Sequence, residues 1–265
     1  MTATGAPEHG VLPLPPSPAG PAWRAVAAQT RAEVTMTLRR GESLLLTLGI
    51  PVVLLGFFAL IGYPDKTLTG GVDTADFLTP GIVALAVMST AMVSLAIATG
   101  FERQYGVLKR LATTPLGRPA LLTAKAAAIL AVEGLQLVVV WVAGVALGWQ
   151  PRGDVTVVAA EVVLATAGFA GVGLLMAGTL RAEMTLAAAN GVYLLLLLTS
   201  GMVVPLAKLP GPVQGVARVL PAANLADALH ATLGTGNAVP GRAWAVLAAW
   251  AVLAPLAAAR AFRWE

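Results

Sequence analysis

The chain contains no cysteine and only two histidines, His9 and His230, among its 265 residues. The lack of cysteine excludes a disulfide framework and a thiolate metal site, and two histidines are too few for a histidine-based metal centre. Charge is also scarce, because only 11% of the residues are Asp, Glu, Lys or Arg while 57% are hydrophobic. Soluble domains carry about 25% charged residues. The composition therefore excludes an ordinary soluble domain and predicts an integral membrane protein.

Motifs for nucleotide binding and for catalysis are missing as well. The pattern GxxxxGK[ST] does not occur, and "TLGTGN" around Gly234 lacks the lysine that would contact a phosphate. There is no HExxH motif, no aspartate-rich stretch and no evident Ser/His/Asp arrangement. We therefore expect no enzyme activity, no bound cofactor and no metal in this chain. The formal net charge of +4 is modest, and basic residues on the cytoplasmic loops of a membrane protein account for it. We therefore expect no nucleic-acid partner.

Six long apolar runs dominate the sequence. A bilayer core about 30 Å thick needs about 20 mostly apolar residues to cross it as a helix. Backbone groups in lipid must be satisfied within the segment, so runs of this length are helices. The fold class predicted is an all-α integral membrane protein with six transmembrane helices, at residues 44–63, 78–100, 120–148, 155–180, 184–205 and 243–262.

The N-terminal part divides into two segments. Residues 1–21 hold six prolines and no Lys or Arg, which predicts a disordered tail rather than a signal peptide. Residues 22–42 hold four arginines and a moderately apolar side, which fits a helix in the membrane interface or a soluble helix leading into the membrane. Residues 22–265 form one predicted domain.

The distribution of basic residues predicts the orientation. With the N-terminus inside, twelve Lys and Arg residues fall on cytoplasmic segments and five fall outside. Because cytoplasmic loops carry the excess of basic residues, we expect both termini in the cytoplasm of a multi-pass protein of the cell inner (plasma) membrane. The segment between the fifth and sixth spans is cut by Pro205, Pro210, Pro212 and Pro221, so it predicts short extracytoplasmic helices instead of a further span.

The stretch "FERQYGVLKRLATTPLGRP", residues 101–119, is a basic segment between two apolar runs. Wound as one helix over residues 101–112, it places an apolar stripe on one side and charge on the other, and Pro115 ends it. The stripe consists of Phe101, Tyr105, Leu108, Leu111 and Ala112. Two simpler interpretations stay open: a loop that only fixes topology, and lipid-headgroup binding by Lys109, Arg110 and Arg118.

The longer stretch "FERQYGVLKRLATTPLGRPALLTAKAAAIL" resembles the segment after the second span of ABC-2 type transporter permeases. The later stretch "NGVYLLLLLTSGMVVPLAKLPGPVQGVARVLPAANLADAL" is similar to the end of their fifth span and the short helices that follow. His230 departs from the pattern, since these permeases often carry Arg there. The resemblance covers about residues 22–262.

In that family the segment after the second span is a cytoplasmic coupling helix that docks on a separate ATPase subunit. The resemblance thus implies that this contact is made by Glu102, Arg103, Tyr105, Lys109, Arg110, Leu111 and Pro115. It also implies a cytoplasmic ABC ATPase partner that carries ATP and Mg, and a second permease chain, identical or related.

A few polar residues interrupt the spans. An acidic residue at mid-span costs roughly 2.5–3.5 kcal/mol on insertion scales and is a candidate functional group. The candidate substrate-path residues are Glu133, Glu161, Asn190 and Tyr193. Structural alternatives are a protonated carboxyl bonded to a neighbouring helix and simple hydrogen bonding between helices. Small residues four apart in the fourth span, Ala167/Gly171 and Gly173/Ala177, predict close helix packing.

The function predicted is the permease subunit of an ATP-driven exporter for a hydrophobic or amphipathic substrate, drug-like (as in multidrug resistance efflux) or lipid-like. The spans offer few charges to hold a polar cargo, and membrane lipid is an expected partner. The alternatives are an integral membrane enzyme or assembly factor without transport activity, and a passive channel.

Overall fold

The computed structural model describes residues 22–39, 41–108 and 117–262, and all regular structure in these ranges is helical. The predicted tail, residues 1–21, lies outside the described residues. The long helices are α1 (Ala22–Arg39), α2 (Gly41–Leu60), α3 (Thr74–Met88), α4 (Leu95–Gln104), α6 (Gly117–Ala146), α7 (Val155–Thr179), α8 (Ala182–Thr199) and α11 (Gly241–Ala261). The short elements are η1 (Ser89–Ser94), η2 (Leu206–Lys208), α9 (Gly211–Ala217), α10 (Pro221–Leu229) and η3 (His230–Thr235).

Five helical segments are long and apolar enough to cross a membrane: Thr74–Gln104, Thr123–Ala146, Val155–Thr179, Ala182–Thr199 and Gly241–Ala261. The apolar part of α2, Thr47–Leu60, is shorter. The prediction of an all-helical, multi-pass membrane protein is therefore confirmed. The prediction that α2 is a sixth span remains a prediction.

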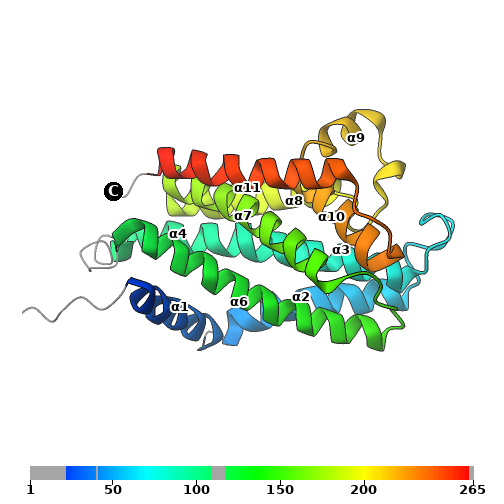
Figure 1. Cartoon of the computed structure of the whole chain (residues 1–265), viewed down its shortest axis with the longest axis horizontal. Coiled ribbons are helices and arrows are strands. Elements are labelled where there is room, and N and C mark those ends of the chain that lie inside the picture. The colour runs from blue at the N-terminus through cyan, green and yellow to red at the C-terminus, as the bar shows by residue number, and fades with distance from the viewer. Residues whose placement is uncertain (1–21, 40, 109–116, 263–265) are drawn as a thin grey trace, which may run out of the picture.

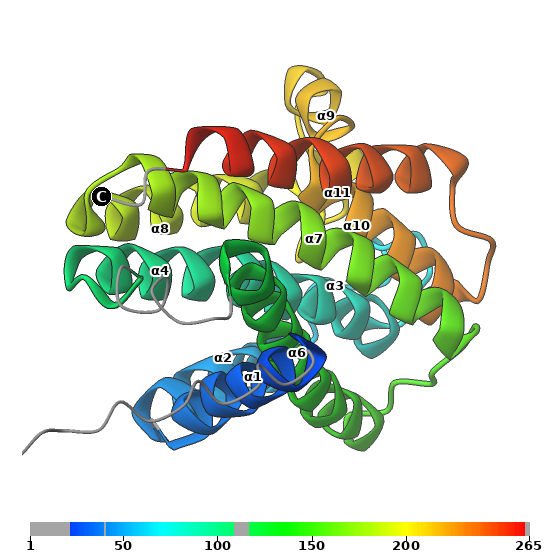
Figure 2. The same cartoon turned by 60° about the vertical axis from the view of Figure 1, so that its left-hand side comes forward.

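Apart from α1, which is tilted against them, the long helices lie roughly side by side along the long axis of the molecule (Figure 1). One layer contains α7, α8 and α11, the opposite layer contains α1, α2 and α6, and the α3–α4 helix runs between them (Figures 1 and 2). Every residue of α3 from Asp76 to Met88 is buried. The core of the protein therefore surrounds α3. The outer helices pack buried apolar residues such as Leu55, Phe169 and Leu247 against it, while other apolar residues of the same helices are exposed on the outside.

The helix that contains α3 and α4 is longer than the predicted span 78–100, because it begins at Thr74 and continues to Gln104. Its middle, η1, is a π-helical turn. The predicted span 184–205 ends early, since α8 stops at Thr199. Gly201 has φ +79°, a left-handed conformation that glycine adopts without steric cost and that cannot continue a helix.

The predicted close packing of small residues is found on α7. A Cβ atom built on Gly171 would lie 2.4 Å from the backbone nitrogen of Pro255 on α11, and one on Gly173 would lie 2.7 Å from the carbonyl oxygen of Met92 on η1. A larger residue at either position would push the helices apart, so these glycines set the distance between α7 and its two neighbours.

The predicted short helices between the fifth and sixth spans are also present. Nearly all of α10 is buried, and it packs against α3, α7 and α11. Thus this segment enters the end of the bundle rather than covering it. Its extracytoplasmic location remains a prediction.

Candidate functional site

The chain changes direction directly after α4. The backbone N–H of Tyr105 donates to the carbonyl of Phe101, and that of Gly106 donates to the carbonyl of Arg103. Gly106 has φ +70°, which is the left-handed conformation that commonly ends a helix. The helical structure resumes at Val107. The predicted single helix over residues 101–112 is therefore wrong in its first half, because it is interrupted at Gly106.

A buried ion cluster lies beside this turn, and we call Glu33, Glu102 and Lys125 the Lys125 cluster. The Nζ atom of Lys125 lies 3.1 Å from Oε1 of Glu33 and 2.7 Å from Oε2 of Glu102. The lysine side chain is only 5% exposed. Burying an ammonium group is expensive unless carboxylates and hydrogen bonds compensate it, so both acidic side chains are held against Lys125. The cluster ties together α1, α4 and α6.

Further contacts fix the same end of the bundle. A guanidinium nitrogen of Arg103 donates to the carbonyl oxygen of Leu180, at the end of α7. The amide of Gln104 donates to Oε1 of Glu183 on α8 at 2.9 Å. The end of α4 is thus bonded directly to α6, α7 and α8, and through Lys125 to α1.

The structure places the predicted coupling residues in two environments. The charged groups of Glu102 and Arg103 are engaged within the chain, whereas the Tyr105 side chain is 69% exposed. Four of the predicted residues lie outside the described residues: Lys109, Arg110, Leu111 and Pro115. Of the predicted residues in the described part of the chain, Tyr105 is the most accessible to a partner.

Sequence reasoning missed Glu33 and the pairing of Lys125. A signal was available, because Lys125 is a lone charge in an alanine-rich stretch at the start of a span, and charges in such positions find partners. Glu33 is the only acidic residue in α1. The sequence does not show that these two residues face each other.

The candidate substrate-path residues are not gathered in one place. Glu133 accepts a hydrogen bond from Thr166 at 2.6 Å, which joins α6 to α7. Glu161 accepts one from Thr232 at 2.7 Å, which joins α7 to η3. Both carboxyl groups are buried, and in each the second oxygen has no hydrogen-bond partner in the described part of the chain. The two carboxyl groups bond threonines on different elements, and no hydrogen bond joins one to the other among the described residues.

The two polar candidates on α8 differ from these acids. The Asn190 amide donates to the carbonyl of Leu186 on its own helix, and the residue is exposed. Tyr193 is partly buried and packs against the hydrophobic core. A buried residue that the sequence reading did not single out is Gln136 on α6. It accepts from the Thr90 hydroxyl and donates to the Thr47 carbonyl, so it links η1, α6 and α2.

The opposite end of the bundle holds the short helices in place. The Arg152 guanidinium contacts the Asp76 carboxylate at 2.8 Å and the Gly234 carbonyl at 2.6 Å. Trp149 donates to the Leu233 carbonyl at 3.2 Å. These bonds connect the α6–α7 loop and α3 to η3, so the segment that enters the bundle is fixed to its neighbours by polar contacts.

His230 belongs to the same region. Its Nε2 atom lies 2.9 Å from the carbonyl oxygen of Phe77, and its ring stacks on the Phe77 ring with the centroids 4.4 Å apart. The residue as a whole is only partly buried, but protein atoms enclose its imidazole ring. Burial of the ring disfavours its charged form and lowers the pKa of His230 to about 4. The ring is therefore neutral at neutral pH and contributes to packing. The permeases that the chain resembles often carry Arg at this position.

The structure contains no group of three or more His, Cys, Asp or Glu residues that could hold a metal ion, as far as the described residues go. The arrangement is a bundle whose polar contacts join helices to one another, with a solvent-exposed turn at one end.

Comparison with known proteins agrees with this architecture. The profile of the ABC-2 type transporter family matches residues 24–233. No curated protein sequence matches the chain. The matched range includes α1, the Lys125 cluster, the turn at Gly106 and the helices up to η3. The chain belongs to the ABC-2 type transporter family and is a multi-pass membrane subunit of an ABC transporter.

Proposed function

We propose that this chain is the permease of an ATP-driven exporter that moves a hydrophobic or amphipathic substrate, drug-like or lipid-like, out of the cytoplasm. Two such chains, identical or related, work with two cytoplasmic ATPase subunits that bind ATP and Mg. Members of this family normally work with a cytoplasmic ATPase subunit. The segment from residue 101 to 115 receives the movement of the ATPases.

The observation that carries the proposal is the Lys125 cluster. A segment that receives a push must be joined rigidly to the helices that move, and here the end of α4 is bonded through Lys125 to α1 and α6. The exposed Tyr105 and the turn at Gly106 stand directly next to this junction. Force applied to the turn therefore reaches three helices without an intervening flexible linker.

The polarity of the long helices supports a hydrophobic or amphipathic substrate. The two buried acids, Glu133 and Glu161, are each bonded to a threonine inside the bundle. Many of the large side chains exposed on α2, α6 and α8 are apolar, with Phe57, Val138 and Leu195 as examples. A surface of this kind favours an apolar substrate and offers little to compensate a polar one.

Co-purification tests the coupling assignment. The double variant Lys109→Glu with Arg110→Glu reverses two charges in the predicted contact, and we expect recovery of the ATPase subunit to fall roughly ten-fold or more. The matched control is Lys208→Glu with Arg218→Glu, which makes the same charge change at exposed positions on the other end of the bundle. Equal recovery with both double variants would refute the assignment.

Orientation is tested by labelling single cysteines, for which the cysteine-free chain needs no background substitutions. Tyr105→Cys and Lys66→Cys place thiols at exposed positions on opposite ends of the bundle. In intact cells a membrane-impermeant maleimide should label position 66, and it should label position 105 only after the membrane is opened. The reverse pattern would place the turn outside the cell and end the proposal.

Direction and substrate class are tested in vesicles that contain the permease and its ATPase. External ATP energises only the complexes whose ATPases face outward, so an exporter should accumulate a hydrophobic fluorescent dye in the lumen. ATP-independent flux in vesicles that carry the permease alone would instead indicate a passive channel.

A further inference from the structure

The charges of α1 are separated between its two faces. Glu33, the only acidic residue of the helix, points inward and contacts Lys125 on α6. Arg24, Arg31 and Arg39 are exposed, and none of them forms an ion pair with another described residue. The outward face of α1 therefore carries positive charge only.

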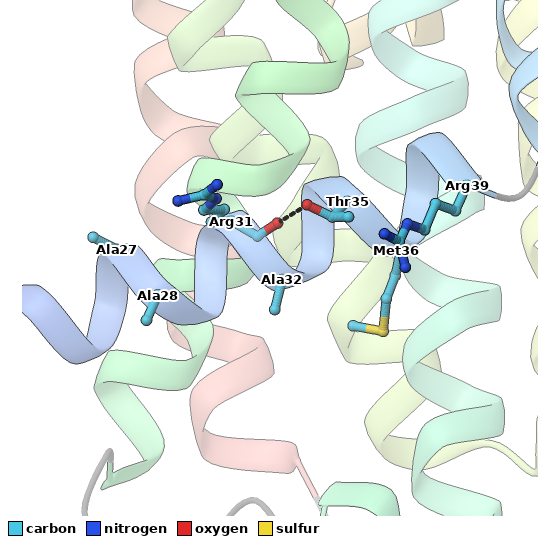
Figure 3. Close-up of a pocket in the computed structure, with 7 residues that line it drawn as sticks. All are labelled: Ala27, Ala28, Arg31, Ala32, Thr35, Met36 and Arg39. Atoms are coloured by element: carbon cyan, nitrogen blue, oxygen red, sulfur yellow. Dashed lines mark hydrogen bonds between the residues drawn. The ribbon is translucent and has the colours of Figure 1, made fainter.

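Between the arginines the outward face is apolar. A shallow hollow of about 620 Å³ is lined by Ala28, Ala32, Thr35 and Met36 between Arg31 and Arg39 (Figure 3). The Thr35 hydroxyl donates to the carbonyl oxygen of Arg31 at 2.7 Å, so its hydrogen bond is satisfied within the helix. Met36 is 49% exposed, and near the start of the helix Trp23 is 65% exposed. We call this face, from Trp23 to Arg39, the α1 surface.

The α1 helix has the orientation that an interfacial helix requires. Its ribbon runs across the long helices behind it instead of parallel to them (Figure 3). A helix that lies in the plane of the membrane surface inserts apolar side chains at the boundary between headgroups and acyl chains, and its basic side chains meet the phosphates. Trp and Arg are typical of that depth, because the ring is amphipathic and the guanidinium group pairs with phosphate.

We propose that the α1 surface binds anionic lipid headgroups of the leaflet that faces the Lys125 cluster. Charge complementarity selects this occupant. Three exposed arginines on α1 form no ion pair within the described part of the chain, and Arg24 only stacks on the neighbouring Trp23 ring, whereas the one carboxylate of the helix, which would repel a phosphate, is directed inward. The proposal does not depend on export or on the ATPase contact. It has a regulatory consequence, since Glu33 and the α1 surface lie on one rigid helix. Binding of lipid to one face of α1 positions Glu33 on the other, and through Lys125 it positions the end of α4.

The test uses the full chain with Ala32→Cys as its single thiol, labelled with an environment-sensitive fluorophore. The protein is placed in nanodiscs of phosphatidylcholine with increasing fractions of phosphatidylglycerol. We expect the emission to shift to shorter wavelength and to saturate as the anionic fraction rises. Each basic residue near an anionic surface strengthens binding roughly five-fold. Replacing Arg24, Arg31 and Arg39 with Gln should therefore raise the half-saturating fraction of phosphatidylglycerol at least about three-fold.

Two control variants keep the result interpretable. Lys66→Gln with Lys208→Gln and Arg218→Gln removes the same number of charges at exposed positions of the other end, and it should leave the titration unchanged. Replacement of the three α1 arginines with Lys conserves charge and should retain most of the response. In size-exclusion chromatography, an elution volume equal to that of the parent protein shows that each variant is folded.

Three outcomes would overturn the proposal. The first is an identical emission shift in pure phosphatidylcholine and in anionic nanodiscs. The second is protection of the fluorophore only when the ATPase subunit is added, and the third is protection only when a second copy of the chain is incorporated. The second and third outcomes would assign the α1 surface to a protein partner.

Discussion

Replacing Lys125 with Met tests whether the Lys125 cluster holds one end of the bundle together. Methionine keeps the length and apolar stem of lysine but removes the charge, so Glu33 and Glu102 face each other without a cation. Breaking a buried ion pair by removing one partner costs about 3–5 kcal/mol. Glu33 and Glu102 retain 16% and 25% exposure, so water compensates them in part. We therefore expect a loss of about 2–4 kcal/mol in the free energy of unfolding.

The measurement is thermal unfolding of the purified chain in detergent, followed by tryptophan fluorescence at a fixed heating rate. For a chain of this size 1 kcal/mol corresponds to about 2–4 °C, so the apparent Tm should fall by roughly 4–16 °C. The matched control is Lys66→Met. Lys66 forms an ion pair with Asp73 at 2.6 Å, but both side chains are well exposed, and exposed pairs contribute little.

A compensated variant separates charge imbalance from damage to packing. Lys125→Met combined with Glu33→Gln and Glu102→Gln removes all three charges, and replacement of a whole buried ion cluster is often neutral in stability. We expect most of the lost Tm to return. If Lys125→Met unfolds at the same temperature as Lys66→Met, or if the compensated variant is no more stable than Lys125→Met alone, the reasoning about this cluster is wrong.

Two other predictions concern packing and pH. Gly171→Ala should destabilise the protein by about 1–3 kcal/mol, because the added Cβ would overlap the backbone of α11. The control is Gly191→Ala, whose added Cβ would have no neighbouring atom within 4 Å and should not destabilise the protein. Unchanged unfolding of Gly171→Ala would contradict the close contact of α7 and α11. His230 has a pKa of about 4 in the folded chain and about 6.5 when unfolded, so the unfolded state binds more protons between these values and stability falls as the pH drops from 6.5 to 4. The variant His230→Gln should lose about 1–3 kcal/mol of this pH dependence, measured as the difference in Tm between pH 7.5 and pH 4.5, and an identical pH dependence in both proteins would refute the assignment.

Three polar side chains of this protein each join separate helices. Lys125 joins three helices at one end, Gln136 joins three elements in the middle, and Arg152 joins α3 and η3 at the other end. Replacing any one of them is therefore expected to alter the relative position of helices as well as stability. This is why transport and ATPase binding should be measured separately in such variants.

Sequence reasoning was most reliable where local composition decides the structure. Long apolar runs must be helical in lipid, because no water satisfies their backbone groups, and the helices at 155–179 and 241–261 follow the predicted spans closely. The prolines between α8 and α11 likewise limit that segment to short helices. The break at Gly106 has a local cause as well, since it is a glycine with a left-handed backbone conformation. The apolar residues on both sides of it keep helical spacing, so the sequence pattern predicted an unbroken helix.

The sequence by itself determined that this is a multi-pass helical membrane protein, where its helices lie along the chain, and which family it resembles, because hydrophobicity and motif spacing are properties of neighbouring residues. Only the tertiary structure decided that Lys125 meets Glu33, which is 92 residues away, that Glu133 and Glu161 bond different threonines, and that α1 turns its one acid inward. Those pairings depend on the rotation and tilt of each helix about its own axis. Rotation and tilt are set by the close packing of α3, α6, α7 and α11 together, and no single segment contains that information.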